Sequence, residues 1–349
     1  MDGSSASSAG TAAAPPRSSC PLDSAQRQSV LQAKLRVLVS TRWPGADPEP
    51  GPFPGGAVAR REGAGWVLAQ DRPERALGGA LAWGRQAGVA ALHVLVEEGA
   101  GGLARRASLF ATSPRVWQVD GRTVEPAEPD PPQMEPSVPP ELVPFRQLIL
   151  DAGADVVVER GVLRAEVLGL EVARVVTDAD GTRLEVGVGA FDREAHRMVH
   201  GDVPTAAALA AAVTAVRDVR RADVPTHQVN QLAGERWMRA ILVRRPEVVG
   251  AASLAPAPSP VERTDLRQLA PAPATGVDLE GRPLVVVCST GVDVDLVPAA
   301  ADARLTDGRG ARLVLVVPEV DDHPLTRALA AALREPAEVV ALPGDWRTL

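Results

Sequence analysis

The stretch ADVVVERGVLRAEVLGLEVARVVTDADGTRLEVGVGAFDRE, residues 154–194, decides the fold of the middle of the chain. Apolar and polar residues alternate along residues 162–167 and 170–176, which is the period-two pattern of a half-buried strand. Residues 155–159 and 183–188 form two further short apolar runs. Gly- and Asp-containing turns separate all four. Because these turns leave no room for crossover helices, the stretch predicts an antiparallel meander.

A helix is expected on each side of this meander. Residues 140–152 carry apolar side chains at helical spacing and stop before Gly153, which suits a helix C-terminus. Residues 191–199 have a similar pattern and stop before Gly201. The order helix, meander, helix therefore predicts a central α+β domain over residues 139–250.

That order resembles the core of the restriction-endonuclease-like superfamily, the PD-(D/E)XK nucleases, over roughly residues 139–245. In this family an acid on one strand and Glu-x-Lys on the next hold a divalent metal and polarise water. The resemblance implies Asp155 or Glu166 as the first acid, Glu171 as the second, and Mg²⁺ as the cofactor. It also implies nucleic acid as the partner of this domain.

The sequence departs from the family pattern at the lysine. Ala173 stands where the lysine falls, and Arg174 lies one residue further, on the opposite face of a strand. The resemblance thus leaves an active nuclease and a catalytically dead relative open. A third interpretation is an α+β domain whose acids are only solvent-facing strand residues.

Composition limits the other classes of function. The 349 residues are 45% hydrophobic, which is enough for two or three domains with sizeable cores. The formal net charge of −7 gives no electrostatic footprint for non-specific binding to nucleic acid or membrane. Cys20 and Cys288 cannot form a disulfide framework or a zinc cluster. With no signal-peptide pattern at residues 1–10, we expect a cytoplasmic protein that does not contact membranes.

Two similar α/β units are expected on either side of the central domain, at residues 30–122 and 281–349. Each reads as strand, helix, strand, helix, strand. The stretch LHVLVE (92–97) resembles LVLVVPE (313–319), which indicates an internal repeat. The predicted fold class is therefore α/β with an α+β insert, in which two βαβαβ units flank the helix–meander–helix domain.

The segments between these domains are predicted from their Pro, Gly, Ala and Ser content. Residues 1–29 are expected to be a disordered tail, and residues 123–138 and 251–280 are expected to be linkers. Within the first unit, residues 32–40 are predicted to form a strand and residues 43–56 a loop.

Ligands of parallel sheets bind beyond the carboxyl ends of the strands. Residues 70–74 and the loop Ser289, Thr290, Gly291 and Asp293 occupy such places, and the second loop could offer backbone N–H groups to an anion. The alternative for this loop is ordinary helix capping. The chain contains neither Gly-x-Gly-x-x-Gly nor a P-loop motif.

Three other groups of side chains are candidate sites. Asp192, His196 and His200 recur every four residues and could form a metal-binding helix face, or else complement the helix dipole. His93 and His323, at corresponding ends of the two units, are expected to pack or cap. Seven arginines could form a basic face, although a solvated, salt-bridged helical surface is favoured: Arg217, Arg220, Arg221, Arg236, Arg239, Arg244 and Arg245.

Two functional hypotheses follow. The first is a nucleic-acid-associated protein whose central domain is a degenerate nuclease; it requires Asp155, Glu166 and Glu171 to converge within metal-binding distance. The second is a non-enzymatic small-ligand-binding or scaffold protein that uses the paired α/β units; its small-ligand form requires a cleft beside residues 289–293. A homodimer is compatible with both.

Overall fold

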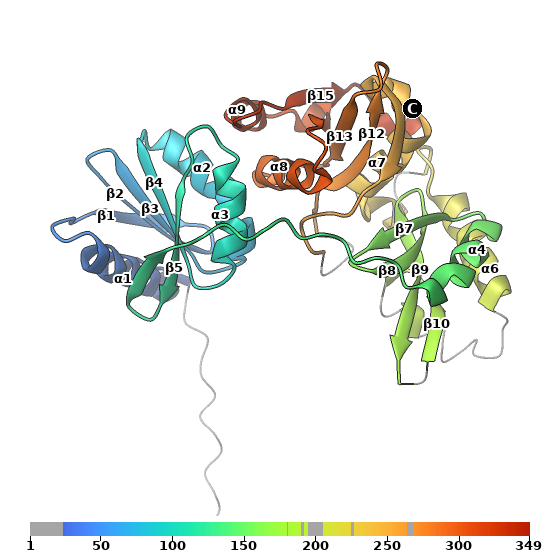
Figure 1. Ribbon diagram of the computed structural model, residues 1–349, viewed down its shortest axis with the longest axis horizontal. Coiled ribbons are helices and arrows are strands. Elements are labelled where there is room, and N and C mark those ends of the chain that lie inside the picture. The colour runs from blue at the N-terminus through green and yellow to red at the C-terminus, as the bar shows by residue number, and fades with distance from the viewer. Residues whose placement is uncertain (1–23, 180, 190–191, 195–204, 225–226, 264–267) are drawn as a thin grey trace, which may run out of the picture.

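The computed structural model describes residues 24–179, 181–189, 192–194, 205–224, 227–263 and 268–349. Within them the strands form three sheets, of six, four and five strands, and helices lie against each sheet (Figure 1). The fold is α/β with an α+β insert, as the sequence predicted. Residues 1–23 of the predicted tail lie outside the described residues.

The N-terminal sheet has the order β1-β2-β3-β4-β5-β6. Its central strands β3, β4 and β5 are parallel, and β1, β2 and β6 are antiparallel to their neighbours. The strand bounds are β1 Glu49–Phe53, β2 Gly56–Arg61, β3 Ala64–Ala69, β4 Ala91–Val96, β5 Arg115–Asp120 and β6 Thr123–Pro126. The helices of this unit are α1 Ser24–Arg42, α2 Leu77–Gln86 and α3 Ala100–Ser108.

Helix α1 corrects the prediction of a strand at residues 32–40, and it starts inside the predicted tail. Leu31, Leu35, Leu38 and Val39 are all buried. Their spacing of four, three and one residues places them on one face of a helix, which covers the outer face of the sheet. The short apolar run at residues 35–39 is compatible with a strand or a helix, and only Leu31 one turn earlier extends it into a helical stripe.

The C-terminal sheet has the order β11-β12-β13-β14-β15. Strands β13, β14 and β15 are parallel, and β11 and β12 are antiparallel to their neighbours. The strand bounds are β11 Ala251–Pro256, β12 Ala272–Asp278, β13 Pro283–Cys288, β14 Arg312–Pro318 and β15 Glu338–Leu342. The helices are α7 Gly234–Arg244, α8 Leu296–Asp307 and α9 Pro324–Ala331.

The two units therefore share one element order, a helix followed by β-β-β-α-β-α-β, and the same strand orientations. The two predicted βαβαβ cores are confirmed. The antiparallel strands beside them were missed: β1 lies in the predicted loop, β2 begins at its end, β6 lies in the predicted first linker, and β11 and β12 lie in the second. All five contain proline or glycine, which have low strand propensity.

The two units bury one common core. Helices α2 and α3 pack against α8 between the two sheets (Figure 1), and one apolar cluster includes buried residues from both units. Phe110, after α3, and Leu333, after α9, form an antiparallel bridge. Ala111 N donates to Ala332 O at 3.0 Å, and Arg334 N donates to Leu109 O at 2.9 Å. This reciprocal exchange between equivalent segments is the pattern of a two-fold interface.

Charged side chains cross the same interface. Arg105 donates to both carboxylate oxygens of Asp302, with distances of 2.8 and 3.0 Å, and Arg106 Nε donates to Asp302 Oδ2 at 2.9 Å. All three side chains are buried. The common core is thus closed by a buried ion pair between α3 and α8.

The central domain contains the predicted meander, with the order β10-β9-β8-β7 and antiparallel pairing throughout. The strands are β7 Asp155–Glu159, β8 Val162–Val167, β9 Leu170–Asp178 and β10 Gly181–Val186. One face is covered by α4 Val143–Asp151, a helix that the sequence predicted, and by α6 Thr205–Val219. The predicted helix at residues 191–199 lies mostly outside the described residues. Short 3-10 turns lie in the segments outside these helices and strands: η1 Pro73–Arg75, η2 Pro140–Leu142, η3 Gln228–Gln231, η4 Pro246–Val249, η5 Glu319–Asp321 and η6 Trp346–Thr348.

An aromatic cluster lies under α1 in the N-terminal unit. His93 is surrounded by Trp43, Trp66 and Trp117, with ring centroids 5.0–5.8 Å away, and its Nδ1 accepts from Trp117 Nε1 at 3.0 Å. Packing of His93 is as predicted, and His323 caps α9 by accepting from Leu325 N. Burial, with the charges of Arg115 and Arg42, lowers the pKa of His93 to about 4.

This pKa predicts an acid-sensitive fold. At pH values above the ordinary histidine pKa of 6.5, His93 is neutral in both states and the fold keeps its full stability. Between pH 6.5 and about 4 the unfolded chain takes up a proton that the fold excludes. The free energy of unfolding should fall over this range by up to about 3 kcal/mol. Urea denaturation at several pH values measures this loss. In His93→Gln, which keeps an acceptor for Trp117, the free energy of unfolding should no longer fall between pH 6.5 and about 4. A variant with the same pH dependence as the parent protein would contradict the prediction.

Candidate functional site

The predicted acids of the central sheet do lie side by side along the backbone. Asp155 on β7 is the register partner of Glu166 on β8, and Glu166 is the partner of Glu171 on β9, after a bulge at residues 165–166. This is the row that the resemblance requires. What each carboxylate contacts decides its chemistry.

Glu166 is held by two arginines of α7. Arg236 Nη1 donates to Glu166 Oε1 at 2.7 Å, and Arg239 Nη2 donates to Oε2 at 2.8 Å. Arg236 also donates to both oxygens of Glu159, at 2.9 and 2.6 Å. Burial works to raise the pKa of Glu159, but the charges of Arg236 and Arg164 outweigh it and the pKa lies below its ordinary value. Burial likewise works against the charge of Arg236, and the two glutamates raise its pKa.

Glu171 is surrounded by three arginines. Arg164 Nη1 is 2.7 Å from Oε2, and Arg174 Nε and Arg193 Nη1 are 2.6 and 3.0 Å from Oε1. Asp155 instead pairs with Arg244 at 2.9 Å on the surface. Each oxygen of Glu166 and Glu171 therefore accepts from a guanidinium, where the resemblance implies a metal.

The second predicted metal site lies mostly outside the described residues, which include neither His196 nor His200. Asp192 is described, and its Oδ2 accepts from Val188 N at 2.7 Å, a local turn contact. Over the described part of the chain, no group of three or more His, Cys, Asp or Glu residues could hold a metal ion.

The predicted solvated arginine surface is wrong for three of its members. Arg220, Arg236 and Arg239 are buried. The guanidinium of Arg220 lies 4.5 Å from the ring centroid of Trp237. It donates to four backbone carbonyls, those of Leu168, Val229, Leu232 and Ala233. Burial lowers its pKa to about 9. These arginines tie α7 and the segment before it to the central sheet.

The predicted ligand loop after β13 is largely used to join the two α/β units. Ser289 is buried, and Gly291 N donates to Asp321 Oδ2 at 2.7 Å. Asp293 pairs with Arg75 of the N-terminal unit. Asp295 Oδ1 accepts from Gly78 N at 2.9 Å, and burial raises the pKa of Asp295 to about 6.

Cavities nevertheless flank this loop. Thr290 lines one of about 440 Å³, and residues 292–295 line another of about 650 Å³. The cleft that the small-ligand hypothesis requires is therefore present. Both cavities also include Gln268, which directly follows residues outside the described part of the chain.

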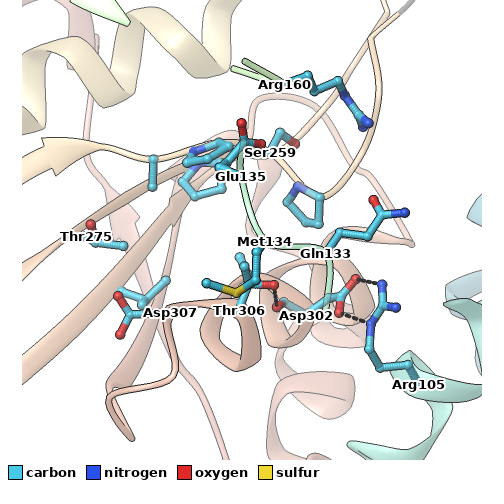
Figure 2. Close-up of a pocket in the computed structure, with 16 residues that line it drawn as sticks. Arg105, Gln133, Met134, Glu135, Arg160, Ser259, Thr275, Asp302, Thr306 and Asp307 are labelled. Carbon is cyan, nitrogen blue, oxygen red and sulfur yellow. Dashed lines mark hydrogen bonds and ion pairs between the residues drawn. The ribbon is translucent and has the colours of Figure 1, made fainter. Parts of the chain in front are cut away.

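A third cavity, of about 270 Å³, lies where all three parts of the chain meet (Figure 2). Its walls come from α8, β12 and β13 of the C-terminal unit, from Arg105 of α3, from Arg160 of the central domain, and from the strap Gln133–Glu135 that joins the N-terminal unit to the central domain. Most of the wall is apolar: Met134, Ala257, Pro258, Pro260, Pro273, Val285 and Ala303. We call this space the junction cavity.

The polar groups of the junction cavity are mostly satisfied by the protein itself. Asp302 is held by Arg105, as the dashed lines of Figure 2 show, and Asp307 is paired with Arg309. Ser259 Oγ donates to Pro271 O at 2.8 Å, and Thr306 Oγ1 donates to Asp302 O at 3.0 Å. The wall from α8 and β13 thus offers a ligand an apolar surface, while Glu135 and Arg160 line the cavity from the strap and the central domain. No feature of the sequence pointed to this site, because its walls come from seven separated segments.

Comparisons with known proteins add no assignment: no family model, curated protein or solved structure matches the chain. Among the helices of the described residues, none has both the length and the apolar character needed to cross a bilayer.

Proposed function

We propose that this protein is a non-enzymatic binding protein that holds a compact, uncharged, apolar molecule in the junction cavity. The observation that supports this most is the apolar part of the wall, together with the ion pairs that already hold its buried carboxylate Asp302 and its neighbour Asp307. Ligand cavities are usually concave, mostly apolar and placed between domains, and this one has all three properties.

The position of the cavity gives the binding a consequence. Because the walls come from the N-terminal unit, the central domain and the C-terminal unit, a bound molecule would contact all three. A ligand that binds only the folded arrangement stabilises it by mass action. The protein would then act as a scaffold whose assembly is strengthened by its ligand.

The nucleic-acid hypothesis remains a prediction for the central domain. The contacts of Glu166 and Glu171 favour the binding protein over a metal-dependent nuclease, since their oxygens already accept from arginines. Incubation with Mg²⁺ and linear, single-stranded or branched DNA or RNA is therefore expected to leave the nucleic acid uncut.

The ligand proposal predicts binding of indole as an apolar probe, detected by saturation-transfer NMR and by a rise in melting temperature. For a molecule of about ten non-hydrogen atoms we expect a dissociation constant on the order of millimolar or tighter. Ala303→Phe should abolish binding because the new ring fills the cavity. The matched control Ala207→Phe, at an exposed position of α6, should bind as the parent does.

Should Ala303→Phe fail to fold, Met134→Gln gives a second variant. Met134 is 76% exposed and lines the cavity from the strap, so the change removes apolar contact without disturbing the core. It should weaken indole binding several-fold. The proposal would be overturned if the parent protein did not bind indole, or if both cavity variants bound it as tightly as the parent protein does.

A further inference from the structure

The two α/β units differ at one edge. Strands β1 to β5 correspond in order and orientation to β11 to β15, and β5 carries an additional antiparallel neighbour, β6. Among the strands that the structure describes, none takes the equivalent place beside β15, which pairs only with β14. The outer edge of β15 is thus the position that β6 fills in the N-terminal unit.

Backbone hydrogen bonds show that the outer edge of β15 corresponds to the edge of β5 that pairs with β6. Val116, the second residue of β5, accepts through its carbonyl from Ala127 N, directly after β6, at 3.0 Å. Val339 is the second residue of β15, and its carbonyl accepts instead from Arg327 Nη1 at 3.2 Å. Because N–H and C=O of one strand residue point to the same side and successive residues alternate, Val339 and Ala341 face the open edge.

The sequence of β15 does not protect this edge. Natural edge strands avoid unwanted pairing with proline, lysine or other charges. Edge strand β1 has Pro50 and Pro52, whereas β15 reads Glu-Val-Val-Ala-Leu, and its residues 339–341 are only partly buried. A largely apolar, half-exposed strand whose outer edge has no neighbouring strand, and whose Val339 carbonyl is held only by the side chain of Arg327, is suited to pairing with another strand.

We propose that the outer edge of β15 is where a second copy of this chain binds, strand to strand and antiparallel. The model for this pairing is internal, since β6 of the same chain pairs antiparallel with β5. A two-fold related copy can offer β15 only in that orientation, and two-fold dimers are the commonest oligomers. The two five-stranded sheets would then form one continuous sheet.

Charge favours the same orientation. Glu335 and Glu338 are exposed at the start of β15. An antiparallel copy places these two acidic starts at opposite ends of the new ladder, whereas a parallel copy would place them side by side. Like charges directly opposite each other in a sheet are destabilising. This proposal is independent of the ligand in the junction cavity.

The test is the molar mass of the full chain, measured by light scattering or sedimentation equilibrium over a concentration series. We expect the mass of two chains at the higher concentrations. Ala341→Pro removes one edge N–H without touching the pairing with β14, and it should shift the protein to the mass of one chain. The matched variant Ala341→Val keeps the N–H and should remain a dimer.

Hydrogen exchange locates the contact without any substitution. In the parent protein the amides of Val339 and Ala341 should exchange more slowly at high concentration than at low concentration. A single-chain mass at every concentration would overturn the proposal, and it would be the result if an extended peptide of another protein were the natural occupant. A dimer that persists unchanged in Ala341→Pro, or shows no protection at β15, would also overturn it.

Discussion

Replacing Arg236 with alanine should lower the free energy of unfolding by about 3–5 kcal/mol, because it leaves buried carboxylates without their partner. Arg236 is buried and makes three hydrogen bonds to Glu159 and Glu166, at 2.6–2.9 Å. Arg239 retains one contact with Glu166, but Glu159 keeps only Arg164, at 3.5 Å. The loss should appear in urea denaturation followed by circular dichroism.

The matched control for this change lies on the same helix. Arg244 pairs with Asp155 at 2.9 Å, but the two side chains are 53% and 43% exposed. Water and salt screen such a pair, so Arg244→Ala should cost less than about 1 kcal/mol. Equal effects of the two substitutions would show that burial adds nothing to the contacts of Arg236.

Asp302→Ala is expected to have a comparable effect on the contact between the two α/β units, about 3–5 kcal/mol. Asp302 is 1% exposed and accepts three hydrogen bonds, from Arg105 and Arg106. Its removal leaves two guanidinium groups buried between α3 and α8. We expect a lower melting temperature and faster proteolysis in the strap between the N-terminal unit and the central domain.

Glu335→Ala serves as the control for Asp302→Ala. Glu335 is 75% exposed and lies 3.6 Å from Arg304, which is on α8 as Asp302 is. It should change the melting temperature little, because water screens the exposed carboxylate of Glu335 and its distance to Arg304 is long for an ion pair. If Asp302→Ala were equally mild, the interface would be held by its apolar core alone.

The strands of the central meander and the two βαβαβ cores could be predicted because their pattern is local. Residues 162–167 and 170–176 alternate between apolar and polar side chains, residues 155–159 and 183–188 form short apolar runs, and both patterns are visible without any neighbouring strand. The missed strands β1 and β12 contain proline and glycine, so local propensity argued against them. Pairing with β2 and β13 outweighs that propensity, and only the tertiary structure shows it.

The candidate site was predicted only in part for a related reason. The adjacency of Glu166 and Glu171 follows from strand register, which turn positions nearly determine. The arginines that contact Glu166 come from α7, 70 and 73 residues later in the chain. Nothing in the spacing of Arg236 and Arg239 distinguishes buried partners from a solvated helix face.

The common core between the two α/β units has a consequence for synthesis on the ribosome. The apolar face of α2 and α3 is completed by α8 and α9, whose residues come after the whole central domain in the chain. At about 5–20 residues per second, that face would wait on the order of ten to forty seconds for its partner. During this interval the nascent N-terminal unit exposes half of a hydrophobic core, which is the kind of surface that chaperones bind. Slower translation of the later segments should therefore increase aggregation of the newly made chain.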